Sequence, residues 1–177
     1  MVTQYVRIPQ ERIGVLIGHK GIVKDEIEQK STSRICVDSE NGAVSIEGVE
    51  GGDPVKTLRV ADVISAIGRG FSPEKAVALI DDERLLFDLI PLDHLTPKAL
   101  KRVKGRIIGQ KGKTRRTIEN LTGVKISIYG KTVSFIGLSY QIRVAHDVIE
   151  MLIKGAPHSA VYGFLERKMR TRVEEEW

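Results

Sequence analysis

The chain has 177 residues, of which 41% are hydrophobic and 29% are charged, and this composition permits a genuine hydrophobic core. No stretch approaches the roughly 18 uninterrupted apolar residues of a membrane span, and the first residues lack the apolar segment of a signal peptide. We therefore expect a cytoplasmic protein without a membrane partner. The formal net charge of +5 weakly favours a polyanionic partner.

The first half of the chain predicts an ordered series of short elements. Apolar spacing changes from strand-like to helical and back along it. The expected elements are a strand over 6–9, a short helix, a helix over 22–30, a hairpin of strands 34–38 and 43–47, and a long helix over 58–67. A connector over 70–83 follows, and its apolar residues 76–80 predict a further helix.

The second half repeats this order. Its expected elements are a strand over 85–92, a short helix, a helix over 113–121, a hairpin of strands 125–129 and 132–136, and a long helix over 141–153. A final helix is expected over 160–173. Both halves therefore read as strand, helix, helix, strand, strand, helix.

The two halves also share a sequence motif. Ile17-Gly18-His19-Lys20-Gly21 matches Ile108-Gly109-Gln110-Lys111-Gly112, which lies 91 residues further on, and Ile27 then matches Ile118. A repeat at a fixed offset indicates two copies of one structural unit. We expect one domain over 1–80, ending in the connector helix, and a second over 84–177.

The repeated motif, the second isoleucine six residues after it and the following hairpin resemble the signature of the type I KH domain. The resemblance implies an α+β fold of two tandem KH domains, each a three-stranded sheet packed on three helices, plus a C-terminal helix. KH domains bind single-stranded RNA, and their Gly-x-x-Gly loop clamps the backbone of about four nucleotides. It implies no cofactor.

Charge separates the two candidate loops. Nine basic residues and no acidic one lie between Lys98 and Arg116, whereas Asp25, Glu26 and Glu28 follow the first loop. We therefore expect the second domain to supply most of the RNA affinity, while the first tunes binding or faces a protein. The predicted RNA-binding residues are Gly109, Gln110, Lys111, Gly112, Lys113, Arg115, Arg116 and Arg106, with Ile108 and Ile126 flooring a groove for bases, and in the first domain Gly18, His19, Lys20, Gly21, Ile17 and Ile35.

An enzyme is not expected. The segment from Gly109 to Thr114 looks superficially like the phosphate-binding loop of NTPases, but position 107, where that loop needs a glycine, is Ile. The four histidines lack the spacing of metal ligands, so no metal site is predicted. Cys36 lies in an apolar run, and we expect it to be buried.

Nearly the whole chain resembles the archaeal double-KH ribosome-assembly factor related to the eukaryotic partner-of-Nob (Dim-two) protein. The most specific stretches are Lys113 to Arg116 and Pro157 to Tyr162. The resemblance implies binding of small-subunit (16S-type) pre-rRNA near its 3′ end, beside the endonuclease that trims it and other small-subunit assembly proteins. Two alternatives stay open: a related Krr-type assembly protein, and a protein-interaction adaptor that docks partners through the helix over 167–177.

Overall fold

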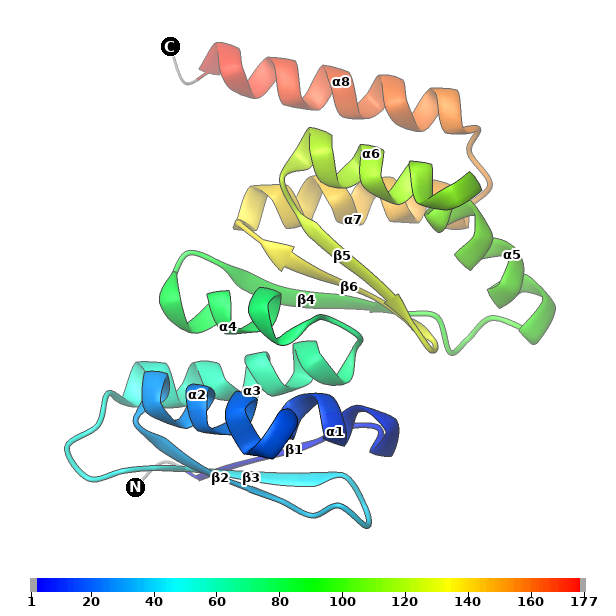
Figure 1. Cartoon of the computed structure of the whole chain (residues 1–177). Coiled ribbons are helices and arrows are strands. Elements are labelled where there is room, and N and C mark those ends of the chain that lie inside the picture. Colours follow the sequence, from blue (N-terminus) through cyan, green and yellow to red (C-terminus); the bar gives the residue numbers. More distant parts are fainter. Residues whose placement is uncertain (1–2, 176–177) are drawn as a thin grey trace. The chain divides into compact units, whose positions relative to one another are not determined.

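The protein is described by a computed structural model that covers residues 3–175, with side chains described as far as residue 173 (Figure 1). The chain forms two compact units, Met1–Phe87 and Asp88–Trp177. Each unit has a three-stranded sheet with helices on one side, so the expected α+β class with two similar domains is confirmed.

The first unit has the predicted element order, followed by the connector helix. In its sheet β3 is central, and Tyr5 of β1 and Cys36 of β2 both pair with Ser45. The elements are β1 (Thr3–Arg7), α1 (Gln10–Ile17), the short 3₁₀ turn η1 (His19–Gly21), α2 (Ile22–Ser31), β2 (Ser33–Val37), β3 (Ala43–Gly48), α3 (Pro54–Gly68) and α4 (Pro73–Asp81).

The second unit repeats this arrangement and adds a long C-terminal helix that packs against α6 and α7. Its sheet has the equivalent order β4-β6-β5, with the later hairpin strand again in the centre. The elements are β4 (Leu86–Pro91), α5 (Pro97–Ile108), the 3₁₀ turn η2 (Gln110–Gly112), α6 (Lys113–Thr122), β5 (Lys125–Tyr129), β6 (Thr132–Gly137), α7 (Ser139–Ile153) and α8 (His158–Glu175).

Element boundaries differ from the expected ones where a proline or a capping side chain decides them. The first strand ends at Arg7, and Pro9 instead precedes α1, because proline has no amide to donate to a sheet. Helix α3 begins at Pro54, four residues before the expected start. The Asp53 carboxylate accepts hydrogen bonds from the amides of Val55 (2.9 Å) and Lys56 (3.4 Å), and this cap adds a turn.

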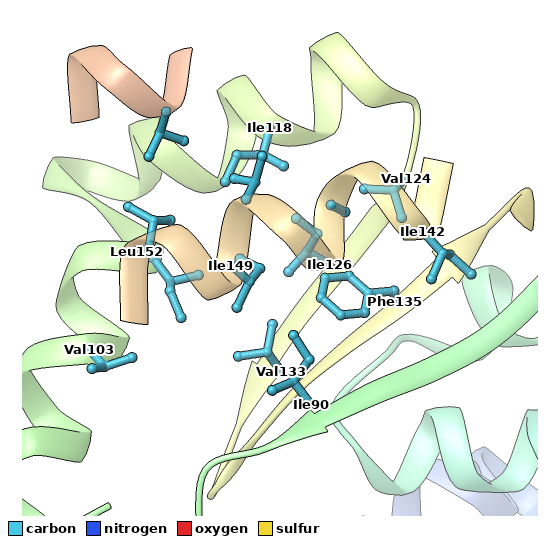
Figure 2. Close-up of a cluster of buried hydrophobic side chains, with 14 of the residues drawn as sticks. Ile90, Val103, Ile118, Val124, Ile126, Val133, Phe135, Ile142, Ile149 and Leu152 are labelled. Carbon is cyan, nitrogen blue, oxygen red and sulfur yellow. The ribbon is translucent and has the colours of Figure 1, made fainter. Parts of the chain in front are cut away.

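The core of the second unit lies between its sheet and helices α5 to α8 (Figure 2). Phe135 of β6 and Ile126 of β5 point from the sheet toward Ile149 of α7, and Ile118 closes the cluster from α6. All four side chains are at most 2% exposed. Because each buries an entire large apolar side chain, each contributes about 1.5–3 kcal/mol to folding.

Cys36 lies on the outer face of the first sheet, contrary to expectation. Cys36 is exposed, although it lies in an apolar run. Strand side chains alternate between faces, and in β2 the residues Ser33 and Ile35 point inward, which turns Cys36 outward. The prediction of a buried thiol was therefore wrong.

The connector forms the expected helix. In α4 the apolar residues Ala76, Val77, Leu79 and Ile80 are buried. Lys30 of α2 forms an ion pair with Asp81 at 2.8 Å, which raises the pKa of Lys30 through the hydrogen bond to that carboxylate.

None of the helices within residues 3–175 has the length and apolarity needed to cross a membrane.

Candidate nucleic-acid interface

The two Gly-x-x-Gly loops have the same backbone conformation. Gly18 has φ 75° and ψ 176°, and Gly109 has φ 73° and ψ 177°. The loops end alike as well, with Gly21 at φ 79° and Gly112 at φ 75°. The sequence repeat is thus a repeat of backbone geometry, and any difference between the loops comes from their side chains.

The first glycine of each loop is required by packing as well as by φ. A Cβ on Gly109 would lie 2.1 Å from Oγ1 and 2.7 Å from the amide nitrogen of Thr114. On Gly18 it would lie 2.5 Å from Cγ2 of Val23. The loop backbone therefore lies directly against the first turn of the next helix, where only glycine fits.

The residue before the last glycine is a lysine in the left-handed conformation in both loops. Lys20 has φ 53° and Lys111 has φ 54°. This conformation costs a non-glycine residue roughly 1–2 kcal/mol. Such strain concentrates at functional positions, and both lysines are exposed.

The N-termini of the helices that follow the two loops differ in their electrostatic surroundings. Helix α6 has no acidic residue in its first turn and no side-chain cap, so the partial positive charge of its N-terminus is not compensated there. Helix α2 has Asp25 in its first turn. At the first helical position α6 has exposed Lys113, whereas α2 has Ile22, which is 67% exposed. The start of α6 therefore has the more positive electrostatic environment of the two.

The basic residues around the second loop are not equivalent. Most are exposed, but the Lys104 ammonium donates a hydrogen bond to the Gly130 carbonyl at 3.0 Å, where it holds the β5–β6 turn. Arg115 is half-buried. The exposed cations are Lys98, Lys101, Arg102, Lys111, Lys113 and Arg116.

Arg106 forms hydrogen bonds within the fold. Its guanidinium donates hydrogen bonds to the carbonyl of Leu152 at 2.7 Å and to that of Ala156. In the first unit Arg12 donates in the same way to the carbonyls of Ile67 (2.8 Å) and Phe71 (3.0 Å). In each unit an arginine of the first helix thus joins that helix to the end of the third. Arg106 is therefore engaged in holding α5.

The glutamates near the loops also have structural partners. Glu28 accepts a hydrogen bond from the Ile35 amide at 2.7 Å, and Glu119 accepts one from the Ile126 amide at 2.9 Å. Glu28 additionally pairs with Lys24 at 3.2 Å. These carboxylates therefore tie the helix after the loop to the neighbouring strand in both units. Of the acids after the first loop, Asp25 and Glu26 are the exposed ones.

The four isoleucines predicted to contact bases differ in exposure. Ile108 is 37% exposed, and Ile17 is partly buried. Ile126 and Ile35 are 2% and 1% exposed and belong to the cores. The isoleucine before each loop is therefore accessible at the surface, whereas the strand isoleucine belongs to the core.

The chain is similar to known KH-domain proteins along most of its length. A family model described as a eukaryotic type (type I) KH domain matches residues 86–170, and a KH domain model matches residues 3–54. A KH domain-containing protein of Methanocaldococcus jannaschii is 41% identical, over 93% of this chain and 73% of its own length. The RNA-binding protein pno1 of Dictyostelium discoideum is 31% identical, over 96% of this chain and 72% of its own length. The chain belongs to the PNO1/Dim2 family of KH-domain proteins.

Two further members of the family extend the comparison. The pre-rRNA-processing protein PNO1 of Chaetomium thermophilum is 37% identical, over 66% of this chain and 46% of its own length. The crystal structure of an a/eIF2alpha–aDim2p–rRNA complex from Pyrococcus horikoshii contains a chain that is 45% identical, with a TM-score of 0.91. That match covers 96% of this chain and 95% of the other. Membership of the PNO1/Dim2 family decides against the Krr-type alternative.

The type I KH family model that matches residues 86–170 extends into α8, and α8 braces the second loop. His158 Nε2 donates to the Arg106 carbonyl at 3.0 Å, and the Tyr162 hydroxyl lies 3.3 Å from Oγ1 of Thr114, the residue against which Gly109 packs. Sequence reasoning singled out Pro157 to Tyr162 as a family feature but assigned it no contact. The role of the glutamates was also missed, although Glu28 and Glu119 recur at the 91-residue offset.

Within residues 3–175 no group of three or more histidine, cysteine, aspartate or glutamate side chains is arranged to hold a metal ion. The four basic or polar loop side chains, His19, Lys20, Gln110 and Lys111, are exposed. The site therefore presents backbone, cations and a small apolar surface, which are the components of a binding interface for a polyanion.

Proposed function

We propose that the protein binds single-stranded RNA of the small ribosomal subunit near its 3′ end and acts as a ribosome biogenesis factor, without catalysing a reaction. The second KH loop supplies most of the affinity. The observation that carries this proposal is the start of α6, where a Gly-x-x-Gly loop meets an uncompensated helix N-terminus among exposed cations.

The relatives support the choice of RNA. One of them is named as a pre-rRNA-processing protein, and the Pyrococcus relative forms a complex with rRNA and a translation factor subunit. By analogy the partners of this chain would be small-subunit rRNA or its precursor, the endonuclease that trims it, and a factor of the eIF2α type. We expect these encounters in the cytoplasm.

The roles within the site follow from its geometry. The loop amides and Lys111 hold a phosphate, and Lys113 and Arg116 neutralise its neighbours along the strand. Ile108 offers the apolar surface for a base. The first loop has the same backbone but more acid around it, so it contributes less to the affinity. Its exposed Ile22 favours a contact less dependent on phosphate charge.

The test is fluorescence anisotropy with a labelled oligonucleotide from the 3′ end of small-subunit rRNA. The proteins are the wild type, Gln110→Asp/Lys111→Asp and His19→Asp/Lys20→Asp, each at two salt concentrations. Aspartate tolerates the left-handed conformation of the two lysines, so both variants should keep the loop backbone. Circular dichroism checks their folding.

We expect the second-loop variant to lose most of its binding and the first-loop variant to lose less. Equal binding by all three proteins would refute the clamp. It would favour the remaining alternative, an adaptor whose KH domains are protein scaffolds docking through the helix over 167–177, of which Glu174 to Trp177 lie outside the described side chains. For such an adaptor we also expect the measured RNA binding to depend little on salt.

A further inference from the structure

The second unit has another cationic feature besides its loop, between α7 and α8. Here the two helices enclose a cleft of about 410 Å³, within the range of ligand-binding pockets. We call it the α7–α8 groove. Its principal lining side chains are Tyr140, Arg143, Phe164, Arg167, Lys168 and Arg172.

The groove is strongly basic. Four of its lining residues are cations, and Asp147 is the acidic residue among those that line it within the described part of the chain. Arg143, Arg167 and Lys168 are exposed. A concave surface with one sign of charge attracts polyanions more strongly than the same charges spread over a convex face.

The groove also contains two organised cation–aromatic pairs. The Arg172 guanidinium lies over the ring of Tyr140, and the Lys168 ammonium lies 5.6 Å from the centroid of the Phe164 ring. A guanidinium over the face of a ring is attracted to it, so less side-chain freedom remains to be lost when the guanidinium binds a ligand. Nucleic-acid bases stack on such guanidinium planes as well as on aromatic rings.

Position favours a nucleic acid over an acidic peptide. The first turns of α8 brace the second loop through His158 and Tyr162, and the groove runs along the same helix from Phe164 to its far end at Arg172, about three turns beyond Tyr162. The ten residues between Tyr162 and Arg172 span roughly 15 Å. At about 3.4 Å per stacked nucleotide, four or five nucleotides cover this length.

We propose that the α7–α8 groove is a second RNA-binding subsite, which takes a nucleotide and its phosphates from the strand that leaves the loop of the second domain. The inference rests on the proposed function, because it requires RNA in the clamp. The bound RNA is then longer than the roughly four nucleotides of a single KH clamp. Oligonucleotides of different length therefore separate the two claims.

The experiment compares the affinities of a labelled oligonucleotide of about six nucleotides, which fits the clamp, and one of about fourteen, which can reach the groove. The groove variants are Arg143→Glu on α7 and Arg167→Glu on α8. The matched control is Arg170→Glu, which reverses an exposed arginine of α8 that does not line the groove. A labelled acidic peptide serves as the competing probe.

For the longer oligonucleotide we expect both groove variants to lose about five- to tenfold in affinity, with a shallower salt slope. We expect the control to lose less than twofold, and we expect all variants to bind the shorter one as the wild type does. Equal losses for Arg167→Glu and Arg170→Glu would overturn the subsite, since they would reflect only the general charge of α8.

Two other results would also decide the matter. Unchanged binding of the longer oligonucleotide by both groove variants would refute RNA binding at the groove. Binding of the acidic peptide would then identify the groove as a protein-binding site. If the wild type bound neither oligonucleotide, the proposed function itself would fail, and the subsite with it.

Discussion

The two glycines of the second loop should differ in what an added methyl group costs. Gly109 and Gly112 both have positive φ, at 73° and 75°, but their surroundings differ. A Cβ on Gly112 would meet only Nη1 of Arg116, at 3.7 Å. On Gly109 it would lie 2.1 Å from Oγ1 of Thr114, so the helix start would have to move. The prediction compares Gly109→Ala with Gly112→Ala.

The expected costs follow from the conformations. Gly112, at ψ 13°, is left-handed, and alanine there costs roughly 1–2 kcal/mol. Gly109, at ψ 177°, lies in a region used almost only by glycine, with strain of up to about 3 kcal/mol. Displacing Thr114 adds to this, because it disturbs the packed first turn of α6. We expect about 3–5 kcal/mol in total, a large part of a typical domain stability of 5–15 kcal/mol.

Urea unfolding followed by far-ultraviolet circular dichroism measures both costs, with the transition of the second domain fitted separately. Gly105→Ala is the control, because Gly105 lies in α5 with open space around its Cα and no positive φ. The Gly105→Ala change should raise the free energy of unfolding of the second domain by about 0.5–1 kcal/mol. If Gly109→Ala cost no more than Gly112→Ala, the close approach of loop and helix would be refuted.

Four further predictions test the remaining assignments. Arg106→Ala should destabilise the second domain by about 1.5–3 kcal/mol in thermal unfolding while leaving RNA affinity nearly unchanged at low temperature, and a selective loss of RNA binding would instead make it a contact residue. Glu119→Ala should cost about 1–3 kcal/mol in the same assay, because the amide of Ile126 loses its acceptor, whereas Glu119→Gln keeps an oxygen and should cost less; equal costs would contradict this. Lys113→Ala should lower the slope of log affinity against log salt by about 0.7, and an unchanged slope would show that it contacts no phosphate. Cys36 should react with a thiol reagent in the native protein at close to the rate of the urea-unfolded chain, and strong protection would contradict its exposure.

The candidate site could be named from sequence, but the hydrogen-bond partners of its side chains could not. The repeat at a constant offset found both loops, and charge counting ranked them. Charge counting did not distinguish exposed Lys113 from Arg106, whose guanidinium bonds carbonyls of residues 46 and 50 positions away in the sequence. Nor did it show that Glu28 is bonded to a strand amide. A side chain's partners depend on which segments the fold brings together, and such long-range contacts leave no local pattern.

The sequence by itself determined the class of fold, the number of repeats and the position of the two glycine loops. Each of these depends on local constraints: alternation and helical periodicity in the elements, and glycine at positions of positive φ. The tertiary structure decided the orientation of Cys36, the bracing of the second loop by His158 and Tyr162, and the basic groove between α7 and α8. These features arise where packing brings distant segments together, and packing is a property of the whole core rather than of any one segment.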